Sequence, residues 1–109
     1  MSTKLSQPLA AYFAGVNVHD IDAMLNPFTD AAIVKDEGRE RRGRDAIREW
    51  IEETTRKYGV TIEVTNAEET ADNTTVTGRV SGNFPGSPIE LRYAFILEGE
   101  KIARLEISS

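Results

Sequence analysis

The chain has 109 residues, of which 39% are hydrophobic and 28% charged, so residues 1–109 are expected to form a single domain around one core. The absence of cysteine excludes disulfides and thiolate metal sites, and the single histidine excludes a multi-histidine metal site within one chain. A formal net charge of −5 at pH 7 makes nucleic acids and anionic membranes poor partners.

Two helices are predicted near the start of the chain. Apolar residues recur there at intervals of three and four, at Leu5, Leu9, Phe13 and Val16. This spacing predicts a helix from about residue 6 to 17, with Ser6 as its cap. Asp20 is predicted to cap a second, short helix that Pro27 would end. The expected apolar residues of that second helix are Ile21, Met24, Leu25 and Phe28.

A short strand is predicted at residues 33–35, and an acidic residue follows it. Alternation along the strand places Asp36 on the same face as Ala32 and Val34, where buried side chains are expected. The next segment, GRERRGR, is basic and contains Arg39, Arg41, Arg42 and Arg44. We expect it to form a solvated loop, and the alternative is that its arginines grip a phosphate-bearing substrate.

A third helix and four strands are predicted in the rest of the chain. The segment RDAIREWIEETTRKYG places Ile47, Trp50, Ile51, Thr54 and Tyr58 along one side of a helix that Gly59 would end. From residue 60 onward the hydrophobic period is two, which predicts strands at 60–64, 74–84, 89–97 and 102–107. Helices followed by an antiparallel sheet form the α+β class.

The predicted sheet has features of a curved surface. Gly78 and Gly82 fall on one face of their strand, where glycine indicates either bending or the close approach of another group. On the next strand one face carries Ile89, Leu91, Tyr93, Phe95 and Leu97. A strongly bent sheet with three helices over its inner face would form a cone with room inside.

The sequence also bears on location in the cell. No apolar run approaches the ~20 residues that span a bilayer, and the first residues, MSTKLSQPLAAYFAGV, lack the long apolar stretch of a signal peptide. We therefore expect a cytoplasmic protein that does not bind membranes.

Three segments of the first half resemble a known family. They are AYFAGVNVHDIDAML, FTDAAIVKDEG and GRDAIREWI, which give a tyrosine-bearing helix, a capped second helix, a strand ending in an acid, and a glycine before the third helix. In these segments and in its order of elements, the chain resembles the nuclear transport factor 2-like superfamily, in the branch of SnoaL-like and ketosteroid isomerase-like proteins. The resemblance implies a cone-shaped, barrel-like α+β fold, with three N-terminal helices over a strongly curved, mainly antiparallel sheet.

The resemblance also implies catalytic roles. Asp36 in IVKDEG matches the general base of the ketosteroid isomerases, and Tyr12 in AAYFAG is similar in placement to a donor that stabilises the oxyanion. Tyr93 in IELRYAFILEG falls where that branch has its second donor, a protonated aspartate, and a phenol can donate the same hydrogen bond. No cofactor is implied.

The expected ligand is an apolar small molecule. Its predicted walls are Phe28, Val34, Trp50, Phe84, Leu91 and Phe95. The resemblance further implies a homodimer formed through the sheet, on a face that carries Ala94, Ile96, Ala103 or Leu105.

Each of these assignments has a structural alternative. Asp36 would be a strand-end acid that is paired with Arg39 or Arg44 or turned into the loop with Gly38. Trp50 and the two tyrosines would belong to the core or its edge, and His19 is expected at the surface. Because dehydratases of this fold use a histidine inside the pocket, dehydration is disfavoured.

Two functions follow from these alternatives. The first is an uncharacterised SnoaL-like small-molecule-binding protein, acting as an isomerase or cyclase by proton transfer next to a carbonyl. The second is a non-enzymatic ligand-binding or protein-association module of the same fold. The enzyme predicts an open cavity that holds Asp36 with a raised pKa, whereas the module predicts a filled cone.

Overall fold

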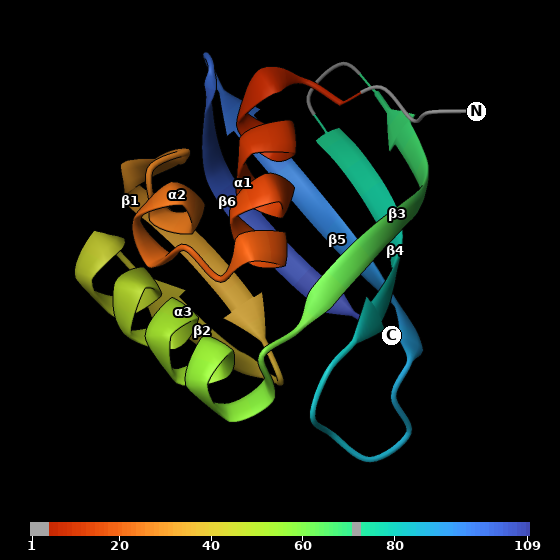
Figure 1. Cartoon of the computed structure of the whole chain (residues 1–109). Coiled ribbons are helices and arrows are strands. Elements are labelled where there is room, and N and C mark those ends of the chain that lie inside the picture. The colour runs from red at the N-terminus through yellow and green to blue at the C-terminus, as the bar shows by residue number, and fades with distance from the viewer. Residues whose placement is uncertain (1–4, 71–72) are drawn as a thin grey trace.

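The computed structural model describes residues 5–70 and 73–109, and within these ranges three helices lie against one face of a six-stranded sheet (Figure 1). The helices are α1 (Gln7–Val18), α2 (Ile21–Leu25) and α3 (Arg44–Tyr58). The strands are β1 (Phe28–Asp36), β2 (Arg39–Arg42), β3 (Thr61–Glu69), β4 (Asn73–Ser81), β5 (Ile89–Glu98) and β6 (Lys101–Ser108).

The sheet is mainly antiparallel. Its strand order is β2-β1-β6-β5-β4-β3, and only the β1–β6 pair among these is parallel. Register irregularities interrupt the β1–β6, β3–β4 and β5–β6 pairs, and such irregularities bend strands and increase their twist. The sheet therefore curves around α1, which crosses its concave face (Figure 1). The predicted α+β cone is confirmed.

Local sequence signals explain the helices. The Asp20 side chain accepts a hydrogen bond from the Ala23 backbone N–H at 3.1 Å, which caps α2. Gly59, with a φ of 53°, ends α3 as predicted. Gly15 permits the close crossing of α1 and α2, because a Cβ there would lie 2.9 Å from the Met24 backbone nitrogen.

The predicted second helix was too long. It ends at Leu25, and Phe28 begins β1 instead. The Pro27 carbonyl accepts a hydrogen bond from the Ile102 N–H at 2.8 Å, which ties this segment to β6. Pairing with the sheet therefore outweighs the helical spacing of Phe28, and Phe28 is completely buried.

The predicted arginine loop was also wrong in part. Arg39–Arg42 form β2, which pairs antiparallel with β1. Glu37 and Gly38 make the turn with φ values of 55° and 75°, the left-handed geometry of a two-residue hairpin. The carboxylates of Glu53, Glu40 and Asp30 lie 3.0 to 4.0 Å from the guanidinium groups of Arg41, Arg42 and Arg44.

Gly78 in β4 and Gly82, just after the end of β4, mark close approaches. A Cβ at Gly78 would lie 2.5 Å from Cδ1 of Ile62, and one at Gly82 would lie 2.8 Å from the Tyr58 carbonyl oxygen. The second contact brings the end of β4 against the end of α3. This junction helps to form the open end of the cone.

Candidate active site

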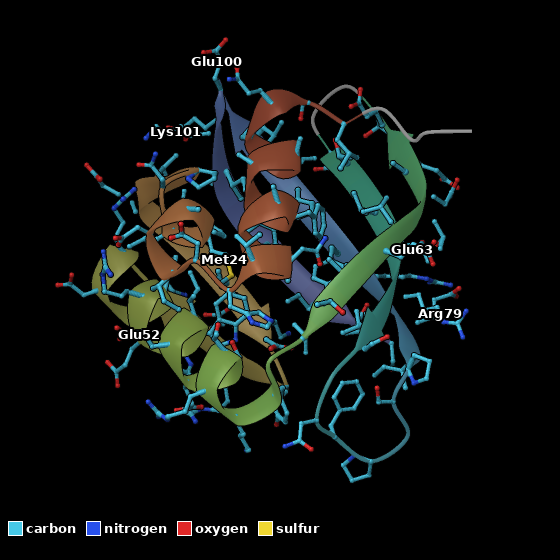
Figure 2. All side chains as sticks on the ribbon, in the orientation of Figure 1. Met24, Glu52, Glu63, Arg79, Glu100 and Lys101 are labelled. Atoms are coloured by element: carbon cyan, nitrogen blue, oxygen red, sulfur yellow. The ribbon has the colours of Figure 1, made fainter. Side chains whose placement is uncertain are left out.

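A cavity of about 230 Å³ opens between α1, α3 and the curved sheet. Its lining is mostly apolar, and side chains from all three helices and from four strands contribute to it. Figure 2 shows one of them, Met24 of α2, between α1 and α3. The lining residues are Tyr12, Val16, His19, Met24, Asp36, Glu37, Trp50, Ile51, Thr54, Thr55, Tyr58, Val60, Val80, Phe84, Ile89, Leu91, Tyr93 and Ile107.

Asp36 lies at the end of β1 with its side chain in this cavity and is half-buried. The Trp50 indole N–H donates a hydrogen bond to Asp36 Oδ2 at 3.1 Å. Trp50 comes from the middle of α3, which packs against β1. Asp36 takes part in no ion pair with another described residue, so the alternative pairing with Arg39 or Arg44 does not form.

The surroundings of Asp36 act on its pKa in both directions. Burial raises the pKa of this carboxyl above its usual value, and the neighbouring Glu37 carboxylate adds to the rise. The Trp50 N–H, the Glu37 backbone N–H and the more distant Arg41 favour the charged form and reduce the shift. The net effect is that the pKa of Asp36 is raised, and a carboxylate that must accept a proton near neutral pH requires a raised pKa.

Tyr12 and Tyr93 line the same cavity from α1 and β5. Burial raises the pKa of both phenols above the ordinary value, and the Asp36 carboxylate raises both further. Both groups therefore remain protonated donors at neutral pH. Among the residues that the structure describes, neither hydroxyl has a hydrogen-bond partner, so both can donate to a ligand.

The predicted wall residues divide into two sets. Trp50, Phe84 and Leu91 line the cavity. Phe28, Val34 and Phe95 are 0% exposed and lie in the core outside the lining. The rings of Phe28 and Phe95 meet the Tyr12 ring edge-on at centroid distances of 5.8 and 6.0 Å, so these two residues support a lining residue from behind.

The mouth of the cavity contains residues that the sequence did not single out as site residues. The Tyr58 hydroxyl donates to Glu37 Oε1 at 3.3 Å, which links α3 to the β1–β2 turn. Phe84 meets the Tyr58 ring edge-on at 6.1 Å. His19 is exposed, as predicted, yet it lines the mouth and donates from Nε2 to the Val60 carbonyl oxygen at 2.9 Å. Alternation along the strand predicted that Asp36 points inward. It did not predict the position of Glu37, because Glu37 reaches the mouth only through the left-handed Glu37–Gly38 turn.

The described part of the chain has neither a cluster of metal-ligating side chains nor a membrane-spanning helix. No group of three or more His, Asp or Glu residues there is arranged to hold a metal ion. None of its helices combines the length and hydropathy needed to cross a bilayer.

Comparisons with known proteins agree with this architecture. A model of the SnoaL-like domain matches residues 9–105. A provisionally assigned polyketide cyclase of Sinorhizobium meliloti is 35% identical, with a TM-score of 0.92 and 95% coverage of each chain. No curated protein matches.

More distant solved structures share the fold. SalBIII, an epoxide hydrolase/cyclase-like enzyme in pyran ring formation in the polyether salinomycin, is 26% identical over 92% of this chain and 85% of its own, with a TM-score of 0.80. A protein of Catenulispora acidiphila with a ketosteroid isomerase-like fold, in complex with trimethylamine, is 19% identical with a TM-score of 0.85, over 97% of this chain and 87% of its own. The domain match and these neighbours confirm the predicted resemblance to SnoaL-like and ketosteroid isomerase-like proteins. The chain belongs to the SnoaL-like domain family.

Proposed function

We propose that the chain binds a compact apolar carbonyl compound in its cavity and moves a proton at the carbon next to the carbonyl, with Asp36 as the general base. The observation that carries this proposal is the placement of a half-buried carboxylate and two tyrosine hydroxyls, which bond to no other described residue, around one mostly apolar cavity. These are the groups that enolisation requires: a base for the proton and donors for the oxygen.

The proposed step uses only groups of this chain. The bond between the α-carbon and its hydrogen breaks, and the proton passes to the Asp36 carboxylate. The electron pair of that bond forms the carbon–carbon double bond of an enolate, and the former carbonyl oxygen takes the negative charge. Tyr12 and Tyr93 donate hydrogen bonds to this oxygen, and the Trp50 N–H holds the Asp36 carboxylate in place. The step transfers a proton, so electrons balance without an oxidant or reductant.

Two outcomes of the enolate are compatible with this site. Return of the proton to a different carbon is an isomerisation, and attack of the enolate carbon on a second carbonyl closes a ring. The provisional assignment of the Sinorhizobium meliloti protein as a polyketide cyclase, at 35% identity, supports ring closure. Both outcomes begin with the same proton transfer.

The non-enzymatic alternative is less well supported. A binding or association module predicts a cone filled by Trp50, Phe28 and Phe84, but the cavity is open and Trp50 bonds to Asp36.

The homodimer and the cytoplasmic location remain predictions. For the homodimer, Ile96 is 40% exposed on the outer face beside Ala94, whereas Leu105 is fully buried in the core and is excluded from that face.

Hydrogen–deuterium exchange tests the proposal without knowledge of the natural substrate. We expect the protein in D₂O to accelerate exchange of the α-hydrogens of small enolisable ketones, such as 2-indanone and substituted arylacetones, with a rate that saturates in ketone. The measurement is the loss of the α-hydrogen signal in the ¹H NMR spectrum, compared with buffer at the same pH. A ketone that binds the protein yet exchanges at the buffer rate would argue against catalysis.

A further inference from the structure

The charges around the cavity are unevenly distributed. Asp36 and Glu37 both line it, and no lysine or arginine of the described residues does. Two cations lie near the lining without being part of it. The Arg41 guanidinium lies 3.8 Å from the Glu53 carboxylate and also favours the charged form of Asp36. The exposed Lys57 ammonium lies 5.2 Å from the centroid of the Tyr58 ring, and Tyr58 and then Glu37 raise its pKa. Among the described residues, neither cation forms an ion pair with Asp36 or Glu37. A ligand in the cavity therefore meets two carboxylates and no basic side chain except His19.

The aromatic lining, like the carboxylates, favours cationic ligands over anionic ones. Five aromatic side chains line the cavity, namely Tyr12, Trp50, Tyr58, Phe84 and Tyr93. The face of an aromatic ring carries partial negative charge, which attracts cations and disfavours anions. The tyrosine and threonine hydroxyls, the Trp50 indole N–H and the His19 ring are the remaining polar side-chain groups of the lining.

Glu37 is the charged group at the entrance. It is exposed, and its carboxylate accepts the hydrogen bond from the Tyr58 hydroxyl at 3.3 Å. This bond holds the negative charge between the β1–β2 turn and the end of α3. Glu37 therefore places a negative charge on the exposed part of the lining, next in sequence to Asp36.

The volume limits the size of the ligand. At about 230 Å³ the cavity is smaller than the roughly 300 Å³ at the lower end of pockets that enclose drug-sized ligands. One or two rings suit this space better than a four-ring skeleton.

From these observations, and resting on the proposed function, we infer that the substrates are compact carbonyl compounds that are neutral or cationic, and that Glu37 at the mouth excludes anionic ones. Glu37 is then a specificity-determining residue that neither donates nor accepts the transferred proton.

Trp50 provides a direct test by binding. It is the only tryptophan of the chain and lines the cavity, so quenching of its fluorescence reports occupancy independently of catalysis. The probes are three arylacetones that differ only in a tetrahedral para substituent: tert-butyl, trimethylammonio or sulfonate. We expect the sulfonate to bind about tenfold more weakly than the tert-butyl compound, and the trimethylammonio compound to bind at least as tightly as the tert-butyl one.

Two variants of Glu37, one that reverses its charge and one that removes it, test whether this residue is responsible. Glu37→Lys is expected to improve sulfonate binding about tenfold, and Glu37→Gln to give a smaller gain of the same sign. Glu37 already has a φ of 55°, so neither replacement introduces a new kind of backbone strain. Glu63→Lys is the matched control, because it makes the same change in net charge at an exposed position on the outer side of β3 beside Arg79, away from the cavity (Figure 2). It is expected to change sulfonate affinity by less than roughly twofold, since distant surface charges are screened by salt.

The possible results distinguish failure of the charge selection by Glu37 from failure of the proposed catalysis by Asp36. Equal binding of the sulfonate and tert-butyl compounds, equal gains from Glu37→Lys and Glu63→Lys, or no quenching by any probe would overturn the inference. Discrimination by Glu37 without any α-hydrogen exchange would support the inference while contradicting the proposed catalysis. Exchange of the anionic ketone as fast as the neutral one would support catalysis and contradict the charge selection.

Discussion

Replacing Asp36 with asparagine is expected to lower the catalysed rate of α-hydrogen exchange by about 10²- to 10⁴-fold, the usual contribution of a positioned general base. Asparagine keeps the size of the side chain and an oxygen that can accept the Trp50 N–H, but it cannot take up the proton. The NMR exchange assay measures this change, and fluorescence of Trp50 checks that ketone binding persists.

The control for this variant is Asp45→Asn, the same chemical change at an exposed position in the first turn of α3. It is expected to leave the exchange rate unchanged. Retention of full activity by Asp36→Asn, or an equal loss in Asp45→Asn, would remove Asp36 from the proposed role.

The same variant has a defined effect on stability. Below the usual aspartate pKa of about 3.9, the Asp36 carboxyl is protonated in both the folded and unfolded states. As the pH rises, the unfolded state ionises first because burial raises the pKa in the folded state, so the wild type loses stability until the pH passes the raised value. Asp36→Asn avoids this loss. Thermal unfolding should therefore show the variant to be at least as stable as the wild type at neutral pH, although its rate of α-hydrogen exchange is expected to be much lower.

Replacing Phe95 with alanine is expected to lower the free energy of unfolding by about 3–5 kcal/mol, as for other large-to-small changes of buried aromatic residues. Phe95 is 0% exposed, and its ring contacts the rings of Tyr12, Phe13 and Tyr93 at centroid distances of 6.0, 5.8 and 6.4 Å. Because two of these neighbours are the proposed oxyanion donors, the rate of exchange should fall as well. Urea unfolding measures the stability change.

Ile96→Ala serves as its control. Ile96 follows Phe95 on β5 but lies on the outer face and is 40% exposed, so its truncation should cost less than about 1 kcal/mol. If the two variants lost the same stability, the inner face of β5 would not be the packed side of the sheet.

Much of the fold could be predicted because its signals are local. The apolar spacing of Ile47, Trp50 and Ile51 fixes the buried side of α3, and strict alternation on β5 places Tyr93 and Phe95 inward. The position of Asp36 beside Val34 on the inner face of β1 follows from the same alternation. These patterns depend only on neighbours in the sequence.

The incorrect predictions arose from contacts between distant segments or from irregular backbone. Alternation along β6 separates Ile102 from Leu105, yet both are fully buried. The pairing of Ile96 with Arg104 and of Leu97 with Ile102 leaves Ala103 as an extra residue, and this bulge returns Leu105 to the inner face. The bond from Trp50 to Asp36 likewise depends on how α3 packs on β1, which no local pattern specifies.

The most direct test of the proposed active site is the pKa of the Asp36 carboxyl, measured by NMR in the wild type and in Trp50→Phe. Burial predicts a value above the usual 3.9 or so, and removal of the indole N–H predicts a further rise, because that hydrogen bond favours the charged form. A value at or below that of a free aspartate, unchanged by Trp50→Phe, would show that Asp36 is a solvated surface group and would contradict its role as the base.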